Sequence, residues 1–375
     1  MSTAGTVRRA AVVTAAATAA LVTGAVGAGA AGGGFVGGLN HNQVVASTVP
    51  ANGDVNPYGV AVVPRSHGRL VAGDVLVSNF NNAPTKAAPS GEQGRGTTLV
   101  EISPSGHKQL FARIPASSVP GGVGLTTALV ALRSGWVIVG SLPTSDGTSA
   151  TMRTGELFVF DSSGALRKTI TGHGIDGPWD ATAVDHGASA QLFVSNVLNG
   201  IVGGRPSTTK RGDVVRLDLS LAGGKPRVTD STVVADRLPV RTDPAALVVG
   251  PTGLAVGPDG SLFVADTVKS RIARVPAATT RSSAVDASAA RRTVAAGAPL
   301  NGPLGLVLAP NGDLLTVNGG NNNLVELTRH GHVVAVRNLD KADPPGGALF
   351  GLATTKKPDA VYYVNDDRNT LDVLR

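Results

Sequence analysis

Apolar and polar positions alternate in short runs along most of the chain, and one arrangement of these runs recurs. Its clearest copy, residues 250–275, reads GPTGLAVGPDGSLFVADTVKSRIARV, and residues 302–327 read GPLGLVLAPNGDLLTVNGGNNNLVEL. Short β-branched and aliphatic runs that end at Gly, Pro, Asp or Asn are typical of strands joined by tight turns. Fainter copies begin near Pro57, Gly121, Gly177 and Ala348. The pattern predicts an all-β fold, a six-bladed β-propeller of four-stranded antiparallel blades.

The last copy lacks an outermost strand, because the sequence reaches Arg375 directly after its third apolar run. Residues 42–49 (NQVVASTV) precede the first copy and belong to no copy of their own. We expect this N-terminal strand to complete the last blade and close the ring, which leaves no long unpaired edge. The propeller then spans residues 42–375. An insertion rich in Ala, Ser and Thr, residues 276–290, is predicted to be mobile.

The N-terminal residues have the composition of an export signal. Residues 1–31 contain Arg8 and Arg9, then a short apolar stretch, then Ala28, Gly29 and Ala30, and no acidic residue. This order predicts a cleaved signal peptide, with residues 32–41 as a flexible linker. A membrane anchor is the alternative, but a stretch this rich in Ala and Gly favours cleavage. We expect a secreted or cell-envelope protein with no membrane span after cleavage.

Charge and composition narrow the classes of partner. The formal net charge is +7 and aromatic residues make up 3% of the chain, which disfavours nucleic acid as a partner. The absence of Cys excludes thiol catalysis and zinc–thiolate sites. We expect a monomer that binds a small molecule or a protein of the cell envelope.

The motifs GLAV, PDG, LFVAD and RIARV within residues 253–275 resemble NHL repeats, and they are similar to the related gluconolactonase and senescence-marker propellers. The resemblance covers residues 42–375. It implies a six-bladed propeller, a fold that hosts binding, scaffolding and several enzymatic chemistries.

The gluconolactonase resemblance also implies metal-binding Asn and Asp side chains just before the first strand of each blade, with a Glu from the first blade. The corresponding residues are Tyr58, Val123, Asp180, Thr252, Leu304 and Phe350. Only Asp180 matches, and Asn56 stands where the Glu is expected. Calcium needs six or more oxygen ligands, so a divalent cation such as calcium stays a prediction that rests on Asp180 alone.

Three aromatic residues, Tyr58, Trp179 and Phe350, fall at this inner rim. They could form the floor of a ligand pocket, since pockets are mostly apolar with a few placed polar groups. They could equally fill the channel as core. The sequence leaves both alternatives open.

The segment that leads into the third blade, residues 171–180 (TGHGIDGPWD), brings His173, Asp176 and Asp180 close together in sequence. A histidine beside carboxylates can act in general acid–base catalysis, so these three are the candidate catalytic residues. The alternative is that they are hydrated turn formers in a glycine-rich loop.

The loops between the second and third strands are long in blades 1 to 3 and short in blades 4 to 6. Each long loop ends near a basic residue: Arg95, Arg153 or Arg211. First strands begin and second strands end on one face of a propeller, here called the top face, so the loops would form a wall there. With Lys86, Arg205 and Lys210, this wall could receive an anionic ligand. Long polar loops that stay hydrated are the alternative.

Two recurring sets of polar residues are expected to be structural. Residues at the ends of second strands would bond neighbouring turns: Asn79, Ser141, Asn196, Asp266, Asn318 and Asn365. Residues at one position of the third strands would make polar contacts on the blade faces: Glu101, Arg216, Arg274 and Glu326.

The sequence thus favours an exported NHL-type propeller that binds a ligand or partner at its top face through the blade 1–3 loops. The alternative is a gluconolactonase-like hydrolase or lyase with its active site at the channel mouth. The sequence favours a binding protein over an enzyme without excluding the enzyme.

Overall fold

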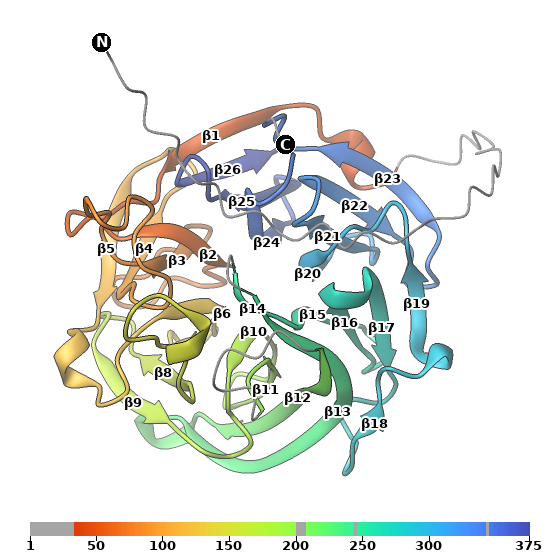
Figure 1. Ribbon diagram of the computed structural model, residues 1–375, viewed down its shortest axis with the longest axis horizontal. Coiled ribbons are helices and arrows are strands. Elements are labelled where there is room, and N and C mark those ends of the chain that lie inside the picture. The colour runs from red at the N-terminus through yellow and green to blue at the C-terminus, as the bar shows by residue number, and fades with distance from the viewer. Residues whose placement is uncertain (1–33, 200–207, 244–245, 343–344) are drawn as a thin grey trace.

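The computed structural model describes residues 34–199, 208–243, 246–342 and 345–375. Its strands form six sheets arranged around a centre (Figure 1). Each sheet contains a blade of four antiparallel strands, the first at the channel and the fourth at the rim, and the sheet of blade 3 has two further strands. The predicted six-bladed propeller is therefore confirmed.

The blades follow the chain in order. Blade 1 consists of β2 (Val55–Val62), β3 (Val75–Asn81), β4 (Thr98–Ile102) and β5 (Lys108–Arg113). Blade 2 consists of β6 (Leu125–Ala131), β7 (Val137–Ser141), β8 (Glu156–Phe160) and β9 (Leu166–Ile170). Blade 3 consists of β10 (Pro178–Asp185), β11 (Ser189–Asn196), β12 (Thr209–Ser220) and β13 (Arg227–Asp243), extended by β14 (Leu247–Val249) and β18 (Val285–Asp286).

The second half of the chain repeats the plan. Blade 4 consists of β15 (Pro251–Val256), β16 (Leu262–Asp266), β17 (Arg271–Val275) and β19 (Thr293–Ala296). Blade 5 consists of β20 (Pro303–Leu308), β21 (Leu314–Asn318), β22 (Asn323–Leu327) and β23 (Val333–Asn338). Short 3-10 turns lie between strands: η1 (Val36–Gly38), η2 (Ala116–Ser118), η3 (Ser149–Thr151), η4 (Ala222–Gly224), η5 (Thr267–Lys269) and η6 (Ala290–Arg292).

Blade 6 is closed by the N-terminal strand, as the sequence predicts. It consists of β24 (Leu349–Thr355), β25 (Ala360–Asn365) and β26 (Thr370–Leu374), with β1 (Asn42–Ser47) as the outermost strand. Asn42 pairs with Leu374 and Ser47 with Thr370. The two ends of the propeller thus share one sheet, and the ring has no open blade.

The core lies between neighbouring blades. The middle strands β3, β4, β7, β16, β21 and β25 are buried along their whole length, whereas the outermost strands β1, β9 and β23 are partly exposed. Valine, leucine and alanine supply most of the buried side chains. This composition explains how a chain so poor in aromatic residues builds a continuous core, because small aliphatic side chains fill the space between closely stacked sheets.

The insertion at residues 276–290 is not mobile, contrary to the prediction. Its strand β18 pairs in parallel with β13, at Val285 opposite Ala235. The buried Arg216 donates to the carbonyl oxygens of Ala278 (3.1 Å) and Arg281 (2.9 Å). The insertion therefore joins blade 3 to blade 4. A composition of Ala, Ser and Thr does not reveal this, because the fixing bonds come from a distant arginine to backbone carbonyls.

Residues 34–41, predicted as part of a flexible linker, lie against blades 5 and 6. The fully buried Glu326 accepts hydrogen bonds from the N–H groups of Phe35 (2.7 Å) and Val36 (2.8 Å), and Val36 is buried. Arg337 donates to the carbonyl of Leu39. The predicted signal peptide, residues 1–31, lies outside the described residues. Within the described residues, no helix has the length and apolar character needed to cross a bilayer.

Candidate functional site

Near its beginning, each first strand bulges against the second strand. In blade 1, Pro57 pairs with Asn79 and Val60 with Val77, so Tyr58 and Gly59 together face one residue. Blades 3 to 6 share this register. The second bulge residue is Gly59, Gly253, Gly305 or Gly351 in four blades, and Asp180 in blade 3. Blade 2 has one more residue in its bulge, Thr126 to Ala128.

These glycines lie where neighbouring first strands approach closely. A Cβ at Gly253 would overlap the carbonyl of Leu304, and one at Gly351 would overlap that of Tyr58. Asp180 has a side chain at the same position. The prediction that aligned Asp180 with Tyr58 and Phe350 is therefore wrong by one residue, because Trp179 is the residue in that place. Val123, also in the predicted set, precedes its strand.

Aromatic side chains from three blades pack together at the upper end of the channel. The ring of Tyr58 stacks on Phe350 (centroids 4.3 Å apart) and on Phe80 (4.6 Å), and Trp179 meets Tyr58 edge-on at 5.8 Å. All four are buried. Leu247 and Val248 of β14, which reaches toward the centre of the ring, belong to the same cluster (Figure 1). The aromatic residues therefore fill the channel beneath the top face.

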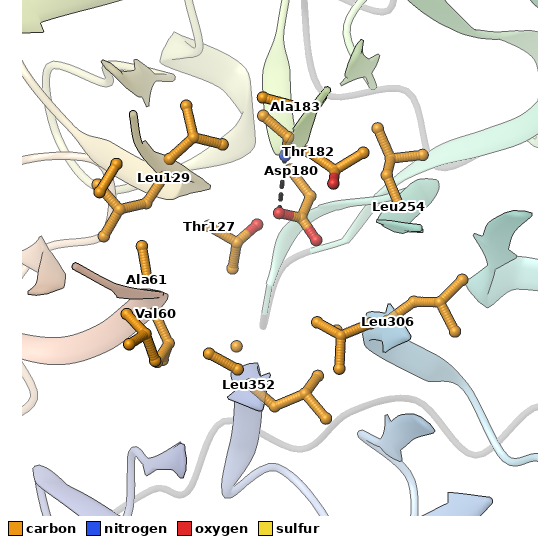
Figure 2. Close-up of a pocket in the computed structure, with 18 of the residues that line it drawn as sticks. Val60, Ala61, Thr127, Leu129, Asp180, Thr182, Ala183, Leu254, Leu306 and Leu352 are labelled. Carbon is orange, nitrogen blue, oxygen red and sulfur yellow. Dashed lines mark hydrogen bonds between the residues drawn. The ribbon is translucent and has the colours of Figure 1, made fainter. Parts of the chain in front are cut away.

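Below these aromatics the channel widens into a cavity of about 430 Å³. All six first strands contribute to its wall, and most of the wall is aliphatic (Figure 2): Val60, Ala61, Leu129, Leu254, Leu306 and Leu352. At the far end lie Leu132, Asp185 and Thr354, each within one residue of the end of a first strand. A second hollow of about 820 Å³, shared with Thr182 and Asp185, continues to the turns of the lower face. The cavity thus extends toward the face opposite the long loops.

The carboxyl group of Asp180 points into this cavity, near Thr127 (Figure 2). Its Oδ1 accepts one hydrogen bond, from the N–H of Ala181 at 2.7 Å. Burial raises the pKa of Asp180 to about 8, and the bond from Ala181 offsets only part of that rise. At neutral pH most of this carboxyl is therefore protonated.

The backbone around Asp180 is fixed by hydroxyl groups. The N–H of Asp180 donates to Oγ of Ser195 (3.0 Å), and this hydroxyl donates to the carbonyl of Thr252 in the next blade (3.0 Å). The hydroxyl of Thr127 donates to the carbonyl of Trp179. These bonds join blades 2, 3 and 4 at the level of the carboxyl group. They therefore fix the backbone position of Asp180.

The structure does not bring the three candidate catalytic residues together. His173 is exposed in the loop before β10, with a left-handed backbone (φ 52°). The backbone of Asp176 is held by Asn196 Oδ1, which accepts from its N–H at 3.2 Å, and by the N–H of Gly155, which donates to its carbonyl at 2.5 Å. Asp180 alone lies in the channel wall. Among the described residues, no hydrogen bond or ion pair links the side chains of the three.

The surroundings of Asp180 do not fit a calcium site. Four of the corresponding bulge positions are glycine, and the described residues include no group of three His, Cys, Asp or Glu side chains suited to a metal ion. The six residues at the ends of second strands are all buried, and most of them bond neighbouring segments through their side chains. Asn318, for example, donates to the carbonyl of Pro299 at 2.8 Å.

The long loops of blades 1 and 2 are joined to each other on the top face. Thr144 N–H donates to the carbonyl of Gly94 (3.1 Å). Arg95 pairs with Glu92 (3.0 Å) and donates to the carbonyl of Ser145. Arg153 and Arg211 are exposed, and Arg211 lies within 3.5 Å of the carbonyl of Asn199. Much of the third loop, residues 200–207 with Arg205, lies outside the described residues. None of the three loop arginines lines the central cavity.

Sequence reasoning missed the lower cavity and the roles of Phe80 and Thr127. One signal was available, because the copies PYG, PTG, PLG and LFG end in glycine where blade 3 has PWD. This comparison identifies Asp180 as an exception at a position of close packing. Phe80 gave no comparable signal, since it lies inside an ordinary apolar strand.

Comparison with known proteins supports the fold and does not name a family. No family model and no curated protein matches the sequence, so the NHL-repeat assignment stays a prediction. Solved structures with the same fold include a candidate gluconolactonase at 16% identity, covering 89% of this chain and 97% of that one, with a TM-score of 0.53. A gluconolactonase from Xanthomonas campestris matches at 13% identity, 90% and 95% coverage and 0.52. A streptogramin B lyase matches at 14% identity, 89% and 98% coverage and 0.51. The predicted resemblance to gluconolactonase propellers holds at the level of fold.

Proposed function

We propose that this chain is an exported binding propeller that holds a small molecule in its central cavity. The observation that carries this proposal is Asp180, whose carboxyl points into an otherwise largely aliphatic cavity at a position where four blades have glycine. A mostly apolar hollow with a few placed polar groups is the usual form of a small-molecule site. The lower face, where the cavity continues into a second hollow, supplies the route of entry.

This assignment moves the ligand from the top face, where the loops suggested it, to the channel interior. The aromatic cluster of Tyr58, Trp179 and Phe350 lies between the top face and the cavity. These three residues then bound the ligand site from above instead of forming a floor open to the top face.

Binding fits the site better than hydrolysis or elimination. The gluconolactonase and the lyase share the fold with this chain, but fold alone does not transfer an activity. A reaction in which one group removes a proton while another donates one needs two ionisable groups within hydrogen-bond reach of the reacting atoms. Within the described residues, the other ionisable residue lining the cavity is Asp185, at its far end.

Fluorescence offers a direct test, because Trp179 is one of two tryptophans and lies beside Asp180. A Trp136→Phe variant keeps Trp179 as the reporter. Neutral and charged fragments are titrated into it and into a second variant that adds Thr182→Phe, which fills the cavity from its wall. We expect some fragments to change the emission of the first protein and not of the second. Equal responses in both, or none in either, would contradict cavity binding.

The top-face loops support a second, independent role in binding a protein partner. Their cross-links, from Thr144 to Gly94 and from Arg95 to Ser145, order a continuous surface over blades 1 and 2. A triple Arg95→Glu, Arg153→Glu, Arg211→Glu variant should lose any partner captured by the native protein from cell-envelope extract. Undiminished capture would rule out these arginines as the contact surface.

Export follows from residues 1–31 and is tested by itself. N-terminal sequencing of the protein recovered outside the cytoplasm should begin near residue 31 or 32. Recovery of the uncleaved chain from the cytoplasm alone would contradict export.

A further inference from the structure

We propose that the ligand of the central cavity is an organic cation, a primary or secondary amine with a compact apolar body. This inference rests on the proposed cavity binding and specifies its chemistry. It is carried by the charges and hydrogen-bond donors that line the cavity.

The cavity wall is acidic and contains no base. Of its lining residues only Asp180 and Asp185 are ionisable, and no Lys, Arg or His is among them. Asp185 is already bonded by backbone N–H groups, of Arg133 at 2.6 Å and of Gly187 at 2.8 Å. Asp180 accepts a single bond. A carboxylate can accept several hydrogen bonds, so Asp180 retains the free acceptor capacity that an ammonium group requires.

Two of the three hydroxyl groups in the wall, those of Thr127 and Thr354, have committed protons, whereas the hydroxyl of Thr182 makes no hydrogen bond to a described residue. Thr127 donates its proton to the carbonyl of Trp179, and Thr354 donates to the carbonyl of Leu308 at 3.1 Å. A hydroxyl whose proton is committed can only accept. Beside Asp180 the wall presents the acceptor Oγ of Thr127, and an ammonium group can donate to this oxygen and to the ionised carboxylate of Asp180. A ligand carboxylate or phosphate would meet two acids and no donor of positive charge.

The rest of the wall selects an apolar body. Leu254, Leu306 and Leu352 face the cavity from three blades, and Leu129 and Val60 complete the aliphatic wall (Figure 2). Burying a small ring against them contributes about 25 cal/mol per Å² of apolar surface. A strongly hydrated cation without such a body, such as a metal ion, would not gain this contribution.

Binding of an ammonium ion requires the ionised form of Asp180. Because its pKa is raised to about 8, the free protein at neutral pH must release one proton when the cation binds. The balance is a neutral carboxyl plus an ammonium ion giving a carboxylate–ammonium pair plus a proton. Affinity should therefore rise about tenfold per pH unit below pH 8, until the carboxyl is ionised in the free protein.

The experiment compares benzylamine with benzyl alcohol, and cyclohexylmethylamine with cyclohexylmethanol, by isothermal titration at pH 6, 7 and 8. Two buffers of different ionisation enthalpy report the proton released. The proteins are the native chain, Asp180→Asn, and Asp176→Asn as a matched control in the same blade but outside the cavity. We expect the amines to bind the native protein and the control at least about tenfold more tightly than the alcohols, with close to one proton released at pH 7. Asp180→Asn should lose this preference and the proton release.

Each other outcome has a distinct meaning. If the alcohols bind as tightly as the amines and Thr182→Phe abolishes both, cavity binding stands and the cation inference is wrong. If the amines bind but Asp180→Asn leaves their affinity and proton release unchanged, the inference is also wrong. If neither series binds the native protein, both the cavity function and this inference are contradicted. Thermal melting of Asp180→Asn verifies that the variant is folded.

Discussion

Asp180 is a residue whose presence the fold does not explain. Four blades place glycine at its position, where neighbouring strands nearly touch, and the carboxyl lies in a mostly aliphatic wall with one hydrogen bond. A half-buried acid in such an apolar wall lowers stability whenever it must ionise. Residues that oppose folding in this way are commonly found at functional sites. The position is therefore better explained by a ligand than by packing.

The destabilisation that Asp180 causes can be measured from how the free energy of unfolding depends on pH. Its pKa, about 8 when folded, is far above the unfolded value, so the folded state binds the proton more tightly. The free energy of unfolding should fall as pH rises from about 4 to about 8 and then level off. Asp180→Asn should match the native protein near pH 4 and exceed it by on the order of a few kcal/mol at pH 8. Urea unfolding at pH 4, 6 and 8 measures this.

Asp161 supplies the opposite control. Burial alone would raise the pKa of Asp161. Hydrogen bonds from Ser163, Arg167 and two backbone N–H groups outweigh this effect and hold the pKa at about 2. An acid with a lowered pKa stabilises the fold above its unfolded pKa. Asp161→Asn should therefore lose stability at pH 6 and 8. The other acids with a raised pKa, Asp213 and Asp366 among them, are present in every variant and cancel in the comparison. Identical pH profiles for Asp180→Asn and the native chain would contradict a protonated Asp180.

At the scale of single elements, the same position of the third strand carries a charged side chain in four blades. These side chains make different contacts. Glu101 accepts from the N–H of Val71 (2.9 Å), and Glu326 holds the N-terminal segment. Arg216 fixes the insertion, whereas Arg274 pairs with Asp259 at the surface. The predicted structural role of this set is confirmed. The same strand position thus secures whichever segment lies beyond it.

Arg216 and Arg274 form a matched pair for testing how the insertion is held. Arg216→Met leaves two backbone carbonyls and Asp218 without their buried partner, so we expect a loss of about 2–4 kcal/mol in the free energy of unfolding. Arg274→Met breaks an exposed ion pair and should cost less than about 1 kcal/mol. Limited proteolysis should cut residues 276–292 in the first variant and spare them in the second. Cleavage there in the native protein would contradict an ordered insertion.

Prediction from the sequence succeeded where the cause of structure is local. Turn residues and alternating strands specify each blade, so the six units and the unpaired third strand of the last one were readable. The bulge was not readable, because Trp179 and Asp180 are one apolar and one polar residue in a pattern that alternates anyway. The aromatic cluster was not readable either, since it needs Phe80 from a second strand and β14 from a hairpin to meet Tyr58. Such contacts depend on how blades stack, which no single copy encodes.

At the scale of the whole molecule, closure makes the ring one cooperative unit. The N-terminal residues contribute β1, the two bonds to Glu326 and the bonds of Asn40 and His41 to the carbonyl of Arg375 (3.0 and 2.6 Å). Together they join the beginning of the propeller to its last two blades. No other blade contains strands so distant in sequence.

Removing residues 34–47 should therefore destabilise the entire propeller, because it exposes the edge of β26 and leaves the buried Glu326 without its backbone donors. We expect a loss of several kcal/mol in the free energy of unfolding, spread over all blades. A synthetic peptide of residues 34–47 should restore part of it, and a chain beginning at Gly34 is the control. Hydrogen exchange that accelerates only in blade 6 would contradict a single cooperative unit.

A strand that closes a ring from the far end of the chain has a consequence for assembly. During synthesis β1 emerges first, and its partner β26 emerges last, so β1 waits unpaired while the other blades form. The β1 strand of a second molecule can pair with β26 in the same register as the chain's own β1. Only the short segment 48–54 connects each β1 to the first blade of its own ring. Concentrated refolding therefore favours reciprocal exchange of this strand between two chains, giving dimers in which each protomer seals the other.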